Sequence, residues 1–270
     1  MRIAVMQARA AVGDVDANLA TIDARAADAA ERSADVLVTP ELFVTGYAPK
    51  RLHAVDPAQQ TRIASALAAT AARHGIAVLA SYPEVATADA SDARGTVAQY
   101  IAATLFDALG REALHYCKVN LFDDDETHAF APGTDAPTTV ELAGMRVSVI
   151  ICFDVEYPEM TRAAALAGAD VVLVPTALTA GFDDVPDVLV RARALENGIG
   201  LAYANHVGVE DGLTFGGGSV IVGPDGDFLA QAGDGAVLLV ADITRDDVAG
   251  ARDAVPYLVK LRRDTYVSWR

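Results

Sequence analysis

The chain has few cysteines and no long apolar run, and each shortage excludes a class of protein. Only Cys117 and Cys152 occur, which does not support a disulfide framework, and two cysteines cannot form a zinc site by themselves. Each of them is therefore either a reactive thiol or a packed core residue. No run reaches the roughly 18 consecutive apolar residues that a membrane helix needs, so we expect no membrane association.

Basic residues are also scarce, which argues against nucleic acid as a partner. The sequence has 21 Lys and Arg against 37 Asp and Glu, which gives a net charge of −16, and it contains no basic block. Nucleic-acid binding needs a concentrated basic surface that replaces counterions. The acidity is explained more simply by solubility than by the nature of a substrate.

The N-terminal residues Met1–Gln7 run directly into an apolar segment that is typical of a strand. They include no basic stretch, long apolar core or small-residue cleavage site of the kind that an export signal carries. We therefore expect the protein to act in the cytoplasm.

Apolar strand-like runs alternate with helical patterns, and this alternation predicts an α/β protein. The expected strands are 2–8, 35–39, 76–81, 98–107, 111–118, 145–151, 171–175, 199–205, 217–222, 227–232 and 236–242. The last three are expected to be hairpin-like, with a turn at 223–226. The expected helices are 16–33, 57–74, 158–168 and 185–197. We expect a hairpin turn at 107–110, an exposed loop over 84–96, and one domain spanning residues 1–270.

Two halves of the sequence echo each other. Residues 1–5 resemble 145–149, and residues 34–40 resemble 169–175. The echo suggests an internal duplication of an α/β unit. Chance resemblance between short apolar strands explains it equally well.

Cys152 lies where a buried strand ends and a helix is expected to begin just after Pro158. A strand-to-helix turn exposes a nucleophile and directs backbone N–H groups at the group that the nucleophile attacks. The positive end of the following helix would favour the thiolate over the thiol. The alternative is a buried structural cysteine.

Two charged residues also lie at predicted strand ends. Lys118 would supply a fixed cation for an oxyanion and a nearby thiolate. Glu41, between an apolar strand and an aromatic loop, would have the raised proton affinity of a general base. Taken singly, Lys118 is also explained by solvation, and Glu41 by exposure or an ion pair. Cys117 faces away from Lys118, because side chains alternate along a strand, and it is the poorer candidate for a nucleophile.

Taken jointly and in this order, Glu41, Lys118 and Cys152 resemble the catalytic motifs of the nitrilase superfamily of carbon–nitrogen hydrolases. Three separate matches in the right order are far more specific than one. The resemblance covers nearly the whole chain through the strand at Gln7, Pro40-Glu41, Lys118–Phe122, Ile151–Asp154, Arg191–Asn197, Gly218-Ser219 and Gly223-Pro224.

This resemblance implies a four-layer α-β-β-α sandwich and a mechanism. Cys152 would attack an amide carbon while Glu41 takes the thiol proton. Lys118 and the backbone N–H of Phe153 would stabilise the oxyanion, and water would then hydrolyse the acyl-thioester. The resemblance implies no metal and no organic cofactor.

A second glutamate is also implied. The stretch 126–133 resembles the family's segment whose glutamate orients the catalytic lysine and the substrate, so Glu126 is expected in that role. The alternative is an ordinary loop carboxylate, in which case Asp123, Asp124 or Asp125 could be mistaken for the functional residue.

The residues after the nucleophile indicate the branch of the family. Members that hydrolyse nitriles typically have Trp-Glu there, whereas Phe153-Asp154 resembles amidases and carbamoylases. The run 152–159, with 190–197 and 203–205, resembles bacterial aliphatic amidases that act on small or ω-amino amides such as 5-aminopentanamide. A carbamoylase or a nitrilase stays open as an alternative, and so does a catalytically silent binding protein on the same fold.

Specificity is expected from the loop 176–187 and from aromatic residues near the entrance. The expected substrate-binding residues are Tyr47, Phe153, Tyr157, Phe182 and Asp183. Asp183, with Asp184 and Asp187, would receive a cationic substrate tail through charge-assisted hydrogen bonds. The alternative for these three acids is surface solvation.

Family members usually assemble as dimers or larger oligomers, so a homodimer or larger homo-oligomer is expected here. The tail 255–269 carries apolar residues in a polar frame that suits such packing. The other expected partner is a small-molecule amide substrate.

Overall fold

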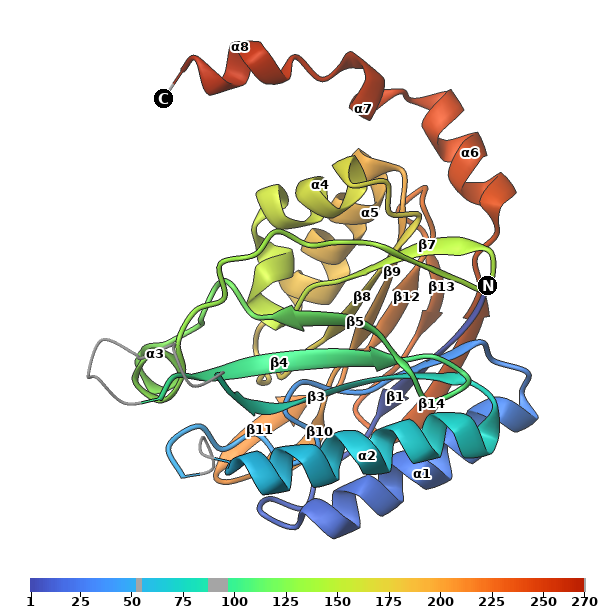
Figure 1. The fold of residues 1–270 in the computed structure, drawn as a ribbon. Coiled ribbons are helices and arrows are strands. Elements are labelled where there is room, and N and C mark those ends of the chain that lie inside the picture. The colour runs from blue at the N-terminus through green and yellow to red at the C-terminus, as the bar shows by residue number, and fades with distance from the viewer. Residues whose placement is uncertain (52–54, 87–96, 270) are drawn as a thin grey trace.

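The structure is a computed structural model that describes residues 1–51, 55–86 and 97–269. Within them, two six-stranded sheets lie face to face, with helices on the outer face of each (Figure 1). The layers therefore run helix, sheet, sheet, helix, and the predicted four-layer α-β-β-α sandwich is confirmed. Part of the predicted loop 84–96 falls outside the described residues, and its first two residues belong to a strand.

The first sheet has the strand order β14-β1-β2-β3-β4-β5. Strands β1, β2 and β3 are parallel, whereas β14, β4 and β5 pair antiparallel with their neighbours. Its elements are β1 (Arg2–Gln7), β2 (Val36–Val38), β3 (Ala77–Val85), β4 (Gln99–Phe106), β5 (Glu112–Cys117), β14 (Val237–Asp242), α1 (Val15–Glu31) and α2 (Pro57–His74).

The second sheet has the order β13-β12-β9-β8-β7-β6 and repeats this pattern. Strands β7, β8 and β9 are parallel, and antiparallel strands flank them on both sides. Its elements are β6 (Val140–Leu142), β7 (Met145–Val149), β8 (Val171–Pro175), β9 (Gly200–Ala204), β12 (Val220–Val222), β13 (Phe228–Gln231), α4 (Pro158–Leu166) and α5 (Arg191–Asn197). The two halves that echo in sequence thus share one topology, and the duplication itself stays a prediction.

Helix α2 shows why these segments fold as they do. The Asp56 side chain accepts a hydrogen bond from the Gln59 N–H, Pro57 takes the first helical position, and Gly75 ends the helix at φ +65°. These are the preferred residues for an N-cap, a first turn and a left-handed C-cap. The buried positions Ile63, Leu67 and Ala71 recur at helical spacing and pack on the first sheet.

Two sequence predictions need correction, and a hairpin and a short helix were missed. Strand β14 does not continue the hairpin of β12 and β13, because it pairs with β1 in the other sheet. The predicted helix 185–197 is a π-helical turn, η2 (Val185–Val190), followed by α5. The hairpin of β10 (Val207–Glu210) and β11 (Leu213–Gly216) was not predicted, and neither was the short helix α3 (Asp124–Ala129).

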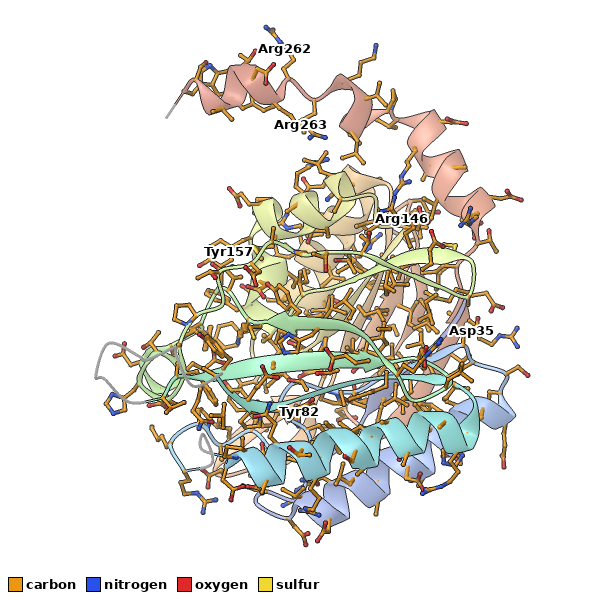
Figure 2. All side chains as sticks on the ribbon, viewed as in Figure 1. Asp35, Tyr82, Arg146, Tyr157, Arg262 and Arg263 are labelled. Atoms are coloured by element: carbon orange, nitrogen blue, oxygen red, sulfur yellow. The ribbon has the colours of Figure 1, made fainter. Side chains whose placement is uncertain are left out.

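The C-terminal segment leaves the sandwich as an extended arm (Figure 1). It consists of α6 (Arg245–Ala254), α7 (Tyr257–Lys260) and α8 (Arg263–Val267), and Figure 2 shows Arg262 and Arg263 well clear of the sheets. Large apolar side chains are exposed on it, including Val259 at 84% and Trp269 at 73%. Among the described residues, no helix is both long and apolar enough to span a bilayer.

Candidate active site

Four side chains singled out from the sequence meet between the two sheets. Glu41 follows β2 and Lys118 follows β5 in the first sheet, Glu126 lies in α3, and Cys152 follows β7 in the second sheet. All four are buried. Segments more than 100 residues apart in the chain therefore supply one site. Glu41, Lys118 and Cys152 each follow the end of a strand, and Glu126 comes from a helix.

Lys118 holds the two glutamates together. Its Nζ donates to Glu41 Oε1 at 2.8 Å and lies 2.8 Å from each carboxylate oxygen of Glu126. Burial alone would lower the pKa of Lys118, but the two carboxylates raise it well above the usual value. The lysine is therefore a permanent cation, and removing it would leave buried carboxylates without their counter-charge.

Glu126 is fixed from several sides. Its Oε1 accepts a hydrogen bond from the Tyr47 hydroxyl at 2.7 Å, and its Oε2 accepts one from the Phe122 N–H at 2.8 Å. Asp123 caps α3 and accepts from the Glu126 N–H. These bonds place Glu126, rather than the neighbouring acids, against Lys118.

Cys152 lies in a strained backbone turn. Its φ is +48°, a left-handed value that non-glycine residues rarely adopt, and the 3-10 turn η1 (Cys152–Glu156) follows directly. Two backbone N–H groups are available near the Cys152 sulfur. Ala177 donates one to the sulfur, and Phe153 lies in the first turn of η1, where N–H groups have no acceptor inside the helix.

The sequence suggested that the end of the following helix would favour the Cys152 thiolate, and the structure does not bear this out. Burial and the charge of Glu41 raise the pKa of Cys152 above its ordinary value, although Lys118 opposes this shift. The cause is that the sulfur lies in an enclosed site, and α4 begins only at Pro158, beyond η1. The resting nucleophile is therefore a neutral thiol that needs a base.

Glu41 has the properties of that base. Burial raises the pKa of Glu41 to about 7, while Lys118 and a contact with the Cys152 thiol act in the opposite direction. Its Oε1 is bonded to Lys118, and within the described residues its Oε2 has no hydrogen-bond partner. One oxygen is thus anchored, and the other is free to exchange a proton.

Asp154 ties the nucleophile turn to the lysine segment. Its Oδ1 accepts from the N–H and the side-chain amide of Asn120, at 2.8 and 2.9 Å. Its Oδ2 accepts from the Tyr116 hydroxyl at 2.8 Å and from the Ile151 N–H at 3.2 Å. Asp154 therefore links the two sheets next to Cys152.

A buried pair behind Glu41 was missed in the sequence. His206 Nε2 lies 2.7 Å from the backbone oxygen of Glu41, and its Nδ1 lies 2.8 Å from Glu210 Oε1. Burial tends to raise the pKa of Glu210, but His206 and two backbone N–H groups lower it overall. A backbone carbonyl can only accept, so the Nε2 atom of His206 donates to the Glu41 oxygen. No sequence spacing pointed to this pair, because β10 was not predicted.

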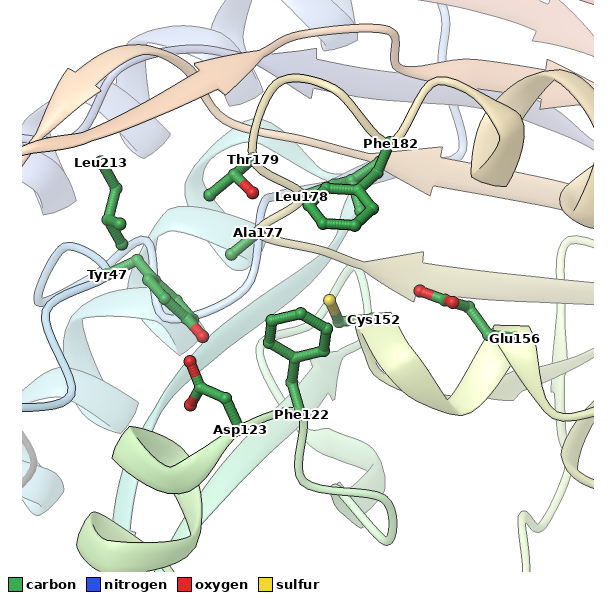
Figure 3. A pocket seen from close by; sticks show the side chains of 10 residues that line it. All are labelled: Tyr47, Phe122, Asp123, Cys152, Glu156, Ala177, Leu178, Thr179, Phe182 and Leu213. Carbon is green, nitrogen blue, oxygen red and sulfur yellow. The ribbon is translucent and has the colours of Figure 1, made fainter.

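A cavity of about 180 Å³ opens above the thiol. Figure 3 shows Cys152 between Tyr47 and Asp123 on one side and Glu156 on the other. The remaining lining residues are mostly apolar: Phe122, Ala177, Leu178, Thr179, Phe182 and Leu213. This is a small, largely apolar pocket with an acid on either side of the sulfur.

The predicted substrate-binding residues divide into two groups. Tyr47 and Phe182 line the cavity, whereas Phe153, Tyr157 and Asp183 do not. Tyr157 is 40% exposed and packs edge-on against Phe153, with ring centroids 5.1 Å apart. The acids that do line the cavity, Asp123 and Glu156, were not assigned to it from the sequence.

Asp184 and Asp187 also lie away from the cavity lining. Both are exposed. Asp187 Oδ1 accepts a hydrogen bond from Gln231. Their positions agree with surface solvation, which was the alternative.

The fold and the site together define a hydrolase that uses a cysteine beside a lysine and a carboxylate. Comparison with known proteins gives the same class. The family model described as carbon-nitrogen hydrolase matches residues 2–253. The chain therefore belongs to the carbon-nitrogen hydrolase family, within the nitrilase superfamily.

Among curated relatives, an (R)-stereoselective amidase from a Pseudomonas species is 34% identical over 96% of this chain and 90% of its own. The 2-oxoglutaramate amidase of Bacillus subtilis is 32% identical over 87% and 88%. Among solved structures, an amidase from a Nesterenkonia species is 41% identical, with a TM-score of 0.89 over 100% of this chain and 96% of that one.

A mutant of the Nesterenkonia amidase shows covalent addition of the acetamide moiety of fluoroacetamide at the active-site cysteine. Another mutant of it was solved in complex with butyramide. The prediction of a carbon–nitrogen hydrolase that cleaves amides through a cysteine intermediate is thus confirmed at the level of reaction class.

Proposed function

We propose that this protein hydrolyses small aliphatic amides to the carboxylic acid and ammonia, with Cys152 as the nucleophile. The observation that carries this proposal is the enclosed thiol, with a charged lysine and a glutamate whose pKa is about 7 beside it. Reduced thiols persist in the cytoplasm, so the proposed location is the cytoplasm.

In the first half-reaction Glu41 takes the Cys152 proton as sulfur attacks the amide carbon. The carbonyl electron pair moves to oxygen, and the oxyanion is stabilised by the Lys118 charge and the Phe153 N–H. When the intermediate collapses, the carbon–nitrogen bond breaks. Nitrogen leaves as ammonia with the proton that Glu41 returns.

In the second half-reaction water replaces the amine. Glu41 accepts a proton from water as its oxygen attacks the thioester carbon. The carbon–sulfur bond then breaks, the acid leaves, and Glu41 returns the proton to the Cys152 sulfur. Glu126 keeps Lys118 in place through both steps, because it contacts Nζ with both carboxylate oxygens.

The cavity supports a short acyl chain. Its volume is about 180 Å³ and most of its lining is apolar, which suits a short alkyl group better than a peptide. The butyramide complex of the related amidase points to the same size of substrate.

A cationic tail on that chain is also proposed, with Glu156 and Asp123 as its partners. Both carboxylates line the cavity, and burial raises the pKa of Glu156 above its usual value. An ammonium group would offset that burial through a charge-assisted hydrogen bond. The acid at 156 thus takes over the role that the sequence suggested for Asp183.

The reaction is tested by ammonia release from a panel of short amides, with Cys152→Ala as the matched variant. We expect turnover to fall at least about a thousandfold, because no other group can form the acyl intermediate. Circular dichroism must show that the fold is kept. Equal turnover by the variant would rule out the cysteine route, whereas a wild type that releases ammonia from none of these amides would favour a silent binding protein.

The same panel separates the other enzyme alternatives. A carbamoyl substrate would release carbon dioxide as well as ammonia, and a nitrile would take up two waters. If the enzyme prefers a carbamoyl substrate or a nitrile over every amide in the panel, the amidase proposal is wrong.

The preference for a cationic tail on the substrate is tested by comparing 5-aminopentanamide with pentanamide. We expect kcat/KM to favour the amino compound in the wild type, and Glu156→Gln to remove that preference. Asp183→Asn is the comparison variant, since Asp183 does not line the cavity. Equal kcat/KM for the two amides in the wild type would exclude the cationic preference and leave the amidase proposal intact.

A further inference from the structure

Three potential metal ligands meet on the first sheet, away from the active site. Glu84 lies near the end of β3, and His115 and Cys117 lie on β5. One carboxylate oxygen, one ring nitrogen and the sulfur lie within 4.8 Å of one another. The His115 Nε2 and Glu84 Oε2 atoms are already 2.9 Å apart.

The sheet itself produces this cluster. His115 and Cys117 are two residues apart on β5, so their side chains point to the same face. Tyr116 between them points to the opposite face, where its hydroxyl bonds Asp154 beside the nucleophile. The cluster and the active site thus lie on opposite faces of one strand.

Strand β4 lies between β3 and β5, and it places a small side chain, Ala102, next to Cys117. Cys117 pairs with Ala102 on β4, and Ala102 pairs with Tyr82 on β3. Glu84 and His115 reach across β4 toward each other.

We propose that Glu84, His115 and Cys117 bind a thiophilic divalent cation, with Zn²⁺ as the reference ion and water as the fourth ligand. Thiolate, imidazole and carboxylate are the ligand types that Zn²⁺ takes, at about 2.0 to 2.3 Å. A tetrahedral site needs donor atoms roughly 3.5 Å apart, which follows from those bond lengths. To reach that spacing around a cation, the His115 and Glu84 atoms, now 2.9 Å apart, would move apart, and the atoms separated by up to 4.8 Å would move closer.

The site is open to solution, as an exchangeable ion requires. The His115 and Glu84 side chains are 33% and 19% exposed. An ordinary surface ion pair would use the same histidine and carboxylate but would not place a thiol beside them. The mixed donor set also explains how a chain with two cysteines can hold zinc, since the second cysteine is replaced by nitrogen and oxygen.

Binding is tested by calorimetric titration of the metal-free full chain with ZnCl₂. The titration uses the Cys152→Ala background, so that the active-site thiol cannot contribute. We expect one Zn²⁺ per chain, and a loss of affinity of at least about a hundredfold in Cys117→Ala and in His115→Ala. Co²⁺ in place of Zn²⁺ should give a thiolate charge-transfer absorption that disappears in Cys117→Ala.

The matched control is His74→Ala. His74 and Asp23 form the same kind of partly exposed pair at 3.0 Å, and the metal-ligand group contains neither of them. Zinc binding should survive this change. If a ligand variant does not fold, His115→Gln and Glu84→Gln replace it. Absence of a one-to-one complex, or binding that survives Cys117→Ala, would overturn the proposal.

Discussion

At the scale of single residues, Glu41 combines two requirements in one carboxyl group. It must be a carboxylate to accept the thiol proton, yet it is fully buried. Lys118 resolves this conflict by placing a cation 2.8 Å from one oxygen. The remaining effect of burial is a pKa of about 7 for Glu41, close to the value that serves a base near neutral pH.

The pH profile should report this value. Protonated Glu41 cannot accept the thiol proton, so kcat/KM should fall tenfold per pH unit below about pH 7 and level off above it. A profile from pH 5 to 9 with a short amide measures it. A flat profile down to pH 5 would contradict the assignment of Glu41 as the base.

The stability has the opposite dependence on pH. The pKa of Glu41 is higher in the folded protein than the ordinary 4.5, so the folded state keeps a proton that the unfolded state has lost. Glu41 therefore lowers the free energy of unfolding as the pH rises from 4.5 through 7. Activity and the Glu41 contribution to stability thus change in opposite directions.

His206 should matter for turnover although it does not touch the substrate cavity. Its ring donates to the Glu41 backbone oxygen, and Glu210 holds its other side. We expect His206→Gln to lower kcat about tenfold to a hundredfold, with KM little changed, because the base moves out of line with the thiol. Steady-state kinetics with a short amide measure the change.

The control for His206 is His74→Gln on the surface helix α2. His74 contacts Asp23 there, far from the site. A double variant of His206 and Glu210 should be no worse than the single one, because the two act as a unit. Additive losses, or a loss in KM alone, would contradict a positioning role.

At the scale of elements, the turn η1 is the joint between the sheets. Asp154 accepts four hydrogen bonds there, from Tyr116, Ile151 and twice from Asn120. Every one of these donors points at a carboxylate oxygen. The strained Cys152 backbone therefore depends on a side chain two residues further along.

Asp154→Asn should destabilise the protein by about 1 to 3 kcal/mol. The amide nitrogen would face donors, so buried N–H or O–H groups would lose their acceptor. Urea unfolding measures the change in the free energy of unfolding. Asp227→Asn is the matched control, because that side chain is 77% exposed and should change stability little. A loss no larger than that of the control would contradict the role of Asp154 as a joint.

The strand and helix pattern was predictable because the central strands of the two sheets are buried on both faces. Strands such as β8 (Val171–Pro175) are uniformly apolar, and α2 has clear caps. The pairing of β14 with β1 was not, since pairing across more than 200 residues leaves no local pattern. The hairpin of β10 and β11 is local, but its strands are only four residues long each, which is too short for a clear alternation. The short helix α3 is polar, so it shows no apolar face in the sequence.

The same distinction applies to the site. Glu41, Lys118 and Cys152 could be found because each lies next to an apolar strand that marks its place. The cavity acids could not, because which residues face the thiol depends on the path of the loops. The raised pKa of Cys152 was also hidden, since enclosure by the other sheet outweighs the helix end.

At the scale of the whole molecule, the C-terminal arm is attached to the core through Val248 of α6, and its last two helices lie beyond this anchor. None of the residues of α7 or α8 is buried. An arm with exposed valine, tyrosine and tryptophan side chains suits a contact with a second copy of the chain. We propose that the arm holds a homodimer or larger assembly together.

Removal of residues 255–270 should reduce the assembly to a smaller species. Light scattering coupled to size-exclusion chromatography measures the mass. The far-ultraviolet circular dichroism should stay close to that of the full chain, because the sheets keep their cores. Val259→Asp should act in the same direction, and Leu109→Asp, which lies in an exposed hairpin turn, should not. An unchanged mass after truncation would exclude the arm as the contact.

The first sheet supplies Glu41 and Lys118, and the second supplies Cys152. The catalytic geometry therefore depends on the alignment of the two sheets. A slip of about one ångström between them would be enough to separate base and nucleophile while each sheet keeps its hydrogen bonds. Enzymatic activity should therefore fade before any spectroscopic sign of melting. Mild heat or denaturant should abolish turnover while the spectroscopic signal of the fold is still that of the native protein.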